Sequence, residues 1–428
     1  MLRPIILASP GAVPARDLPL GLAAFTDVLL IAPTGWQDVP SSLLQSLGKL
    51  TMVPATEPPS ASLLDECRRF RPDGVTTLSE ETMPLAVQLA RELDLPVLSD
   101  LETVTDKLAQ RHALRDLEAT RSFAVDAFSD WDAIVRETGL PMVVKPVRGN
   151  GSRSTFLARS VAEGREVTSA IWARSPGQLL AAEEFLPSRP SGPYGSFVSV
   201  ESFVVGGRVS HFGVTGKLPQ LAPFRETSHF YPSTLEPQER RQVEELARKA
   251  VEAVGVQNGA THTEIKLTPT GPRVIEVNAR LGGYIHEIYG RVLGVNVVDL
   301  AVRASCGQTV EFPEPSRDVV FYQYSHQPPA IASRLIDVKG TREVRRSPGI
   351  TRYDVLVRPG SDLPDDSRSF DLDLLCGQTD SHEAMLAQLD EAHSRLTFHF
   401  ERGDAAVDFT GRELARQKTS DQALKDAS

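Results

Sequence analysis

The sequence predicts a multidomain protein that combines α/β and α+β architecture, and three observations support this. In residues 1–102, short apolar runs alternate with helical patterns, as in a parallel α/β sheet. Residues 261–280 contain two alternating runs around a turn, which is the pattern of a β-hairpin. From residue 311 onward, short strands with Pro and Gly turns surround one helix, which is typical of a small α+β unit.

Composition limits the class of protein. The chain has 428 residues, enough for about two to four domains. Its net charge of −10 disfavours nucleic acid or an anionic membrane as the main partner. Cys67, Cys306 and Cys376 are far apart and show no metal-ligand spacing, which fits a reducing cytoplasm. Because no apolar run is long enough for a signal peptide or a membrane span, we expect a cytoplasmic protein.

The N-terminal hundred residues give a fold class and no function. The runs PIILAS, DVLLIAP, DGVTTLSE and LPVLSD are expected to form strands, and SLLDECRRF and residues 81–93 to form helices. A Gly-x-Gly-x-x-Gly fingerprint is missing, so the usual dinucleotide site is not indicated.

Two basic residues follow at element boundaries. Residues 103–115 predict a helix capped by Thr105 or Asp106, with Lys107 in the first turn, where a cation does not favour the helix dipole. PMVVKPVRGNGSRS predicts a buried strand that ends at Lys145 and continues into a glycine-rich loop. Backbone N–H groups of such a loop can approach phosphate oxygens. Taken alone, such features are more often a solvated lysine and a simple turn, and they gain weight only from the motifs that follow.

The next segments leave alternatives open. QLLAAEEFLPS is either a core strand running into a linker or an edge whose backbone reads an adenine. Strands with a turn at Gly206 and Gly207 follow, and Glu201 falls on their polar face. Residues 218–234 predict a long functional loop carrying Glu226 and His229, although an isolated loop histidine usually has no role.

The hairpin at residues 261–280 carries the strongest chemical signal. It follows an amphipathic helix expected over residues 236–254. Alternation places Ile265 and Leu267, and likewise Ile275 and Val277, on the apolar face, while His262, Glu264, Lys266, Glu276, Asn278 and Arg280 occupy the other. A turn near Thr270 would set Glu264 opposite Glu276, and two opposed carboxylates repel each other. A cation relieves this repulsion, and carboxylate and amide oxygens suit Mg²⁺.

The rest of the chain adds a helix over residues 285–293 and the α+β unit. We find no catalytic constellation in residues 311–415 and expect residues 416–428 to be a frayed polar tail.

The order of these motifs resembles the ATP-grasp superfamily. IEVNARLGG is the most specific stretch and KPVRGNGS is the next, and the resemblance covers residues 1–310. FRETSHFYPST and the hairpin are similar to the L-amino acid ligases, the bacilysin-type dipeptide synthetases, among the carboxylate–amine ligases. The resemblance implies an N-terminal pre-ATP-grasp domain (1–102), an ATP-grasp domain (103–310), a C-terminal α+β domain (311–415) and a polar tail (416–428).

The resemblance also implies a role for each matching residue. Nucleotide contacts would come from Lys107, Lys145, Gly149, Gly151, Ser152, Ser154, Glu183, Glu184 and Leu186. Metal ligands would be Glu264, Glu276 and Asn278, holding two Mg²⁺ ions, for which Mn²⁺ can substitute. Catalytic groups would be Arg280, His229 and Glu226, and the same three residues with Gly283 and Tyr284 would form the substrate pocket.

The implied activity is ATP-dependent amide formation through an acyl phosphate, from small amino-acid, carboxylate or amine substrates. Phe197 stands where many members of the superfamily have a ribose-binding acid, so the ribose contact would come from elsewhere. Two alternatives stay open: a ligase of nucleotide biosynthesis acting on a phosphorylated amine, and a non-catalytic ATP-binding module. A homodimer is also left open.

Overall fold

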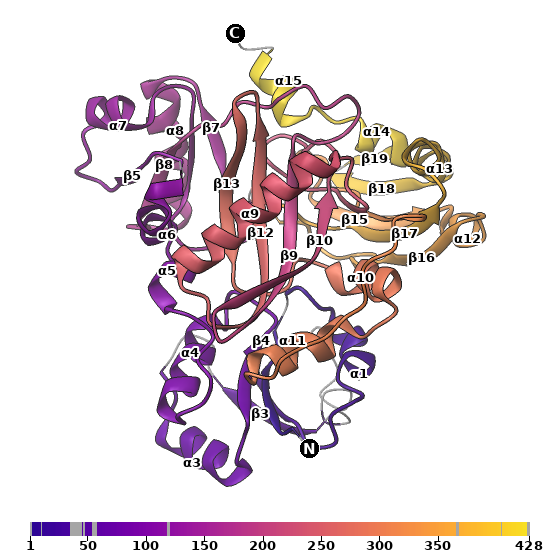
Figure 1. Cartoon of the computed structure of the whole chain (residues 1–428). Coiled ribbons are helices and arrows are strands. Elements are labelled where there is room, and N and C mark those ends of the chain that lie inside the picture. The colour runs from indigo at the N-terminus through magenta and orange to yellow at the C-terminus, as the bar shows by residue number, and fades with distance from the viewer. Residues whose placement is uncertain are drawn as a thin grey trace.

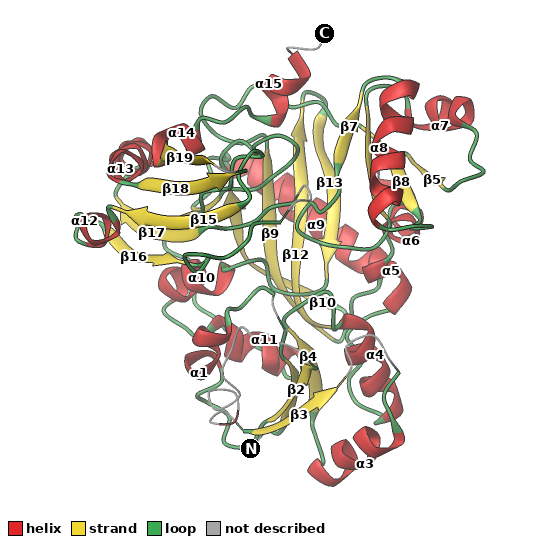
Figure 2. Ribbon diagram, turned by 180° about the vertical axis from the view of Figure 1, so that it is seen from behind, coloured by secondary structure: helices red, strands yellow, loops and turns green. Residues whose placement is uncertain are grey.

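The computed structural model describes residues 2–9, 11–34, 45, 48–53, 58–117, 120–364, 368–403 and 405–425. Within these residues the strands form four sheets, flanked by helices (Figures 1 and 2). The N-terminal part lies at one end of the molecule, and the long central strands rise from it (Figure 1).

The N-terminal sheet is parallel, in the order β3-β2-β1-β4, as the alternation of strand and helix signals predicts. Its elements are β1 (Pro4–Leu7), β2 (Leu29–Pro33), β3 (Lys49–Val53), β4 (Gly74–Thr77), η1 (Ala15–Asp17), α1 (Leu18–Gly21), α3 (Ala61–Phe70) and α4 (Met83–Glu92). The strand expected at LPVLSD does not form, and residues 95–100 have no regular secondary structure. Instead, the carbonyl of Leu98 accepts hydrogen bonds from the N–H groups of Gln257 and Asn258, at 2.8 and 3.2 Å.

A second, antiparallel sheet has the order β5-β8-β6-β7. It contains β5 (Ser122–Val125), β6 (Met142–Pro146), β7 (Phe156–Ala158) and β8 (Leu180–Glu184), with α7 (Trp131–Thr138) and α8 (Val161–Arg174). The helix expected over residues 103–115 is divided into α5 (Leu101–Thr105) and α6 (Lys107–Ala113), followed by η2 (Arg115–Leu117). Asp106 caps α6 by accepting from the N–H groups of Leu108 and Ala109, so Lys107 begins that helix.

The largest sheet has eight strands in the order β13-β12-β9-β10-β11-β14-β17-β16. Its first five strands in chain order are β9 (Phe197–Val205), β10 (Arg208–Gly216), β11 (Ser228–Tyr231), β12 (Asn258–Thr268) and β13 (Gly271–Asn278). The apolar side of α9 (Pro237–Val254) packs on this sheet through Val243 and Ala247, as its helical spacing predicts (Figure 1). The segment 218–234, which the sequence predicts as a long loop, contains β11 and is only partly a loop.

The C-terminal residues contribute to the same sheet. β14 (Val320–Tyr324), β16 (Ile350–Val355) and β17 (Asp373–Thr379) extend it, so the large sheet crosses the expected boundary at residue 311. A separate three-stranded sheet contains β15 (Arg334–Lys339), β18 (Thr397–Arg402) and β19 (Ala405–Thr410). The remaining helices are α10 (Ile285–Leu293), α11 (Val297–Ser305), α12 (Thr341–Arg345), α13 (His382–Arg395), α14 (Gly411–Ala415) and α15 (Ser420–Lys425).

The expected frayed tail is wrong for residues 417–421, which are held by specific hydrogen bonds. The N–H of Ala222 donates to the carbonyl of Lys418, and the N–H of Ser420 donates to the carbonyl of Gln220, at 2.8 and 2.9 Å. The Ser420 hydroxyl accepts from the N–H of Phe224 at 2.9 Å. This segment thus pairs with the start of the 218–234 segment.

No helix among the described residues is long and apolar enough to cross a membrane.

Candidate active site

A cavity of about 460 Å³ gathers residues from every part of the chain. Its walls come from the loops that follow β1 and β4, from α6, from the β5-β8-β6-β7 sheet, from the β12–β13 hairpin, from the segment before β11 and from the loop before β17. All the predicted site residues except Ser154 line it: Lys107, Lys145, Gly149, Gly151, Ser152, Glu183, Glu184, Leu186, Glu226, His229, Glu264, Glu276, Asn278, Arg280, Gly283 and Tyr284. The fold therefore brings together groups separated by up to 177 positions, although their roles stay predictions.

The hairpin has the predicted register, in which Glu264 lies directly opposite Glu276. A bulge follows Glu264, so Ile265 pairs with Val274. This bulge corrects the expected face of Ile275: Val274 and Val277 are buried in the core, whereas Ile275 faces the cavity.

Each of the two opposed carboxylates has a different cationic neighbour. Glu276 lies 3.0 Å from the Lys107 ammonium, and Glu264 lies 3.6 Å from Nε2 of His262. Burial tends to raise the pKa of Glu264, but the hydrogen bond and charge of His262 lower it to about 2. Glu264 is therefore an anion at neutral pH.

His262 is itself held by a buried acid. Its Nδ1 lies 2.9 Å from the carboxylate of Glu201, which also accepts from the hydroxyls of Ser199 and Thr215. Burial alone would lower the pKa of His262, but the Glu201 carboxylate raises it to about 9. The imidazolium is packed against Gly282, where an added Cβ would lie 2.4 Å from Nδ1.

A buried ion cluster supports the opposite wall. Glu183 accepts from Arg111 at 3.0 Å and from Lys145 at 2.7 Å. Burial raises and these two cations lower the pKa of Glu183, which falls to about 2. For Lys145, burial outweighs the attraction of Glu183 and lowers the pKa.

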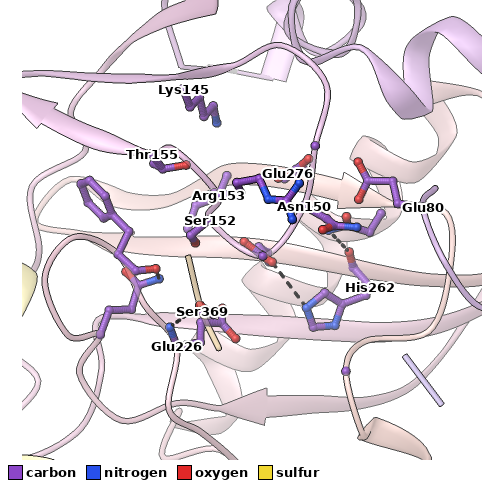
Figure 3. A pocket seen from close by; sticks show the side chains of 18 of the residues that line it. Glu80, Lys145, Asn150, Ser152, Arg153, Thr155, Glu226, His262, Glu276 and Ser369 are labelled. Carbon is purple, nitrogen blue, oxygen red and sulfur yellow. Dashed lines mark hydrogen bonds and ion pairs between the residues drawn. The ribbon is translucent and has the colours of Figure 1, made fainter. Parts of the chain in front are cut away.

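The glycine-rich loop, residues 149–154, lies between these groups. The carbonyl of Gly149 accepts from the Lys107 ammonium at 2.7 Å, and the carbonyl of Gly151 accepts from the N–H of Ser369 at 2.8 Å. In Figure 3 the loop residues Asn150, Ser152 and Arg153 lie between Lys145 and His262. Ser369 also accepts from the N–H of Glu226, so it connects this loop with the segment before β11.

Glu226 and His229 share one partner, Lys217 at the end of β10. The buried Lys217 ammonium lies 3.1 Å from the Glu226 carboxylate and 3.0 Å from Nδ1 of His229. Because an ammonium only donates, Nδ1 of His229 accepts and the ring proton is on Nε2. Burial, Lys217 and His262 all lower the pKa of His229 well below its usual value, which keeps the ring neutral.

Arg280 and Tyr284 complete the pocket. The Arg280 guanidinium lies 3.5 Å from the carboxylate of Glu80, which comes from the N-terminal domain. Tyr284 has a positive φ of 56°, unusual for a bulky residue. Ala12 accepts its N–H and Gln323 donates to its carbonyl, both at 2.9 Å, so the surrounding structure holds this conformation.

Two further positions, Glu184 and Phe197, bear on the predicted contacts with adenine and ribose. The N–H of Glu184 already donates to the carbonyl of Arg121 at 2.8 Å, so an adenine would have to be read by other backbone atoms. Phe197 is buried and does not line the main cavity.

Sequence reasoning missed Glu80, Arg111, Lys217 and Asp371 as cavity or supporting residues. Glu80 and Arg111 have no local signal, because their partners lie 200 and 72 positions away. Lys217 could have been noticed as a charged residue that directly follows the run FGVTG at the end of β10.

The donor set of the hairpin is compatible with a hard cation. Within the described part of the chain, no group of three or more His, Cys, Asp or Glu side chains could hold a metal. The protein would therefore offer two carboxylates and the Asn278 amide oxygen, whose only donor among the described residues is Arg280 at 3.4 Å. Mg²⁺ suits such a set, because it usually takes few protein carboxylates and completes its octahedron with phosphate and water oxygens.

Comparisons with known proteins identify the class. Residues 138–287 match the family described as "ATP-grasp domain". Residues 138–287 therefore form an ATP-grasp domain, and the fold of the chain is the ATP-grasp fold, as the sequence motifs predict.

Curated relatives include an alanine–anticapsin ligase and a carnosine synthase. The chain is 28% identical to alanine–anticapsin ligase of Bacillus subtilis (strain 168) over 271 residues, which cover 57% of this chain and 56% of that protein. It is 28% identical to carnosine synthase 1 of Homo sapiens over 287 residues, 60% of this chain and 34% of that one. The matches thus span about half the length of the alanine–anticapsin ligase and a third of the carnosine synthase.

A solved structure has the same fold over nearly the whole chain. L-amino acid ligase from Bacillus licheniformis superimposes with a TM-score of 0.77 at 21% identity, covering 94% of this chain and 99% of that one.

Proposed function

We propose that this protein is an ATP- and Mg²⁺-dependent carboxylate–amine ligase that joins two amino acids, or an amino acid and another small acid or amine. The observation that carries the proposal is the register-paired Glu264 and Glu276, which share one cavity with Lys107, Lys145 and Arg280. The relationship to alanine–anticapsin ligase supports amino acids as the substrate class.

The proposed reaction has two steps. A substrate carboxylate oxygen attacks the γ-phosphorus of ATP, the bond to the β-phosphate oxygen breaks, and ADP leaves. The amine nitrogen of the second substrate then attacks the acyl carbon, inorganic phosphate leaves with the bonding electrons, and the nitrogen loses one proton. The amide product is lighter than its two substrates by one water.

The chain's own residues would position the phosphates and neutralise their charge, which is most of what phosphoryl transfer requires. Lys107 and Lys145 would face the transferred phosphate, and the glycine-rich loop would cover it and exclude water. Glu264, Glu276 and Asn278 would hold Mg²⁺, which when bound neutralises phosphate charge.

The opposite end of the cavity would receive the substrates. Arg280 would bind the carboxylate or the developing oxyanion. His229, neutral and protonated on Nε2, would act as a hydrogen-bond donor to substrate oxygen rather than as a base, because Lys217 already donates to Nδ1. Glu226 would accept from the substrate amine.

The alternatives are weaker on this geometry. A phosphorylated amine would need a further cation for its own phosphate, but Arg225 does not line the cavity, because its guanidinium donates to the carbonyls of Ala222 and Pro328. A non-catalytic module would have no need of the paired metal carboxylates.

The test is phosphate release from ATP and Mg²⁺ with single amino acids and all pairwise mixtures, with products identified by mass. Release that requires a pair, with a product lighter by one water than the sum, is the expected result. ATP binding with no release from any pair would overturn the ligase proposal in favour of the non-catalytic module.

A further inference from the structure

One carboxylate in the cavity differs from all the others. Seven carboxylates line the cavity, and six have a cationic partner from the chain. These six are Glu80 with Arg280, Glu183 with Lys145, Glu184 with Arg121, Glu226 with Lys217, Glu264 with His262, and Glu276 with Lys107. Asp371 is the seventh, and no cation among the described residues pairs with it.

Asp371 is nevertheless held in one position. The side-chain amide of Gln327 donates to its Oδ1 at 2.8 Å, and the oxygen of the same amide accepts from the N–H of Phe370 at 2.6 Å. Gln327 is fully buried, so this support is rigid. The second oxygen of Asp371 has no hydrogen-bond partner among the described residues and is free to meet a ligand in the cavity.

No cation among the described residues compensates the negative charge of the Asp371 carboxylate. Burial first, and then the like charges of Asp373 and Glu226, raise the pKa of Asp371 to about 7. Asp373, only two residues away, shows what a structural carboxylate looks like in this fold. It accepts from His326 and from the hydroxyl of Tyr353 and is completely buried.

Asp371 comes from a different element from the groups proposed to handle the reacting atoms, and it lies near enough to Glu226 for that carboxylate to raise its pKa. Arg280 follows the hairpin, and Glu226 and His229 come from the segment around β11, whereas Asp371 precedes β17. Polar side chains that line the same cavity include those of Tyr284, Gln323, Ser325 and Ser369. A substrate whose α-groups meet Arg280 and Glu226 would therefore extend another part toward Asp371.

We infer that Asp371 forms a subsite for the side-chain ammonium or guanidinium of a basic amino acid, which is one of the two substrates. This inference rests on the proposed function. The carboxylate would form a charge-assisted hydrogen bond with the substrate cation, and the protein would thereby prefer a basic amino acid over a neutral one of the same shape.

The experiment compares isosteric pairs. Arginine is compared with citrulline, and lysine with norleucine, both by calorimetric binding in the presence of MgADP and by phosphate release with a second amino acid. The wild type is expected to prefer at least one basic member by tenfold or more. Asp371→Asn should reduce that preference to about twofold or less, and Asp371→Glu should retain part of it. The control Asp362→Asn removes an exposed carboxylate of the same C-terminal part and should leave the preference unchanged.

The outcomes separate the two proposals. Turnover of neutral pairs with no basic preference would overturn the subsite and leave the ligase intact. Basic preference in binding without phosphate release would support the subsite while the ligase fails. Equal binding of the basic and neutral members, or a preference that survives Asp371→Asn, would overturn the subsite whatever the turnover.

Discussion

Glu264 and Glu276 lie opposite each other in the β12–β13 hairpin, yet their carboxylates are paired with cations from different elements. Glu276 is paired with Lys107 of α6, and Glu264 lies near His262 on its own strand. The two like charges are therefore tolerated without a metal, and the hairpin keeps a pair of hard oxygen donors ready for one.

Replacing Glu264 tests the metal assignment directly. Glu264→Gln keeps the shape but removes the negative charge, so phosphate release should fall by about a hundredfold or more. The same substitution should weaken the Mg²⁺ dependence of nucleotide binding, measured by titrating Mg²⁺ against a fluorescent ATP analogue. Glu245→Gln, on the exposed side of α9, is the control. Wild-type turnover in Glu264→Gln would show that this carboxylate holds no metal.

Lys217 should control the protonation of His229. The pKa of His229 is lowered because the ring is buried and lies beside Lys217 and His262, so the ring is neutral well below pH 6.5. Lys217→Met removes one of these cations and should raise that pKa, so activity should be lost at a higher pH on the acidic side than in the wild type. Turnover measured from pH 5 to 8 checks this, with Lys249→Met on the surface of α9 as a control. An unmoved acidic limb would exclude His229 as the titrating group.

Sequence reasoning predicted secondary structure and register correctly where hydrophobic periodicity and local chemistry indicated the same element. The parallel N-terminal sheet, α10 and the register of Glu264 against Glu276 all follow from alternation or helical spacing. These features depend on neighbours a few positions away, so a single chain suffices to predict them.

What sequence reasoning missed depends on long-range partners. The bulge after Glu264 moves Ile275 to the cavity side, because the pairing skips one residue of β13. Residues 417–421 look polar and unconstrained, but backbone groups of residues 220–224 pair with them. The pairing of Glu80 with Arg280 across domains leaves no trace in either local stretch.

The buried cluster around Glu183 should dominate acid sensitivity. The pKa of Glu183 in the folded chain is about 2, against an ordinary value of 4.5. A depressed pKa contributes stability that is fully present above about pH 4.5 and is lost as pH falls toward 2. Glu183→Gln leaves Arg111 and Lys145 buried without their anion and should lower the free energy of unfolding by about 3–5 kcal/mol at pH 7. Urea denaturation measures this change, and a loss below 1 kcal/mol would mean that the cluster behaves as a surface ion pair.

The two adjacent glycines Gly282 and Gly283 should respond differently to alanine. An alanine Cβ at Gly282 would lie 2.4 Å from Nδ1 of His262, whereas one at Gly283 meets no atom within 4 Å. Gly282→Ala should therefore displace His262 from Glu201 and destabilise the fold by about 1–3 kcal/mol, and Gly283→Ala should change stability by less than about 0.5 kcal/mol. Thermal unfolding of the two variants is the measurement, and equal melting temperatures would contradict the packing of His262 on Gly282.

Ser420 should affect the substrate-facing segment from a distance. Its hydroxyl accepts from the N–H of Phe224, and its own N–H donates to Gln220, both of which line the cavity. Ser420→Ala removes the first hydrogen bond, worth about 1 kcal/mol, and should raise KM for the amino-acid substrates several-fold while kcat changes little. Ser420→Thr retains the hydroxyl and should restore KM. Among the described residues, no hydrogen bond joins residues 220–224 to a predicted nucleotide-binding residue, so KM for ATP should stay constant. A parallel rise in both KM values would point to general loosening of the fold rather than to a role for Ser420 at the substrate end.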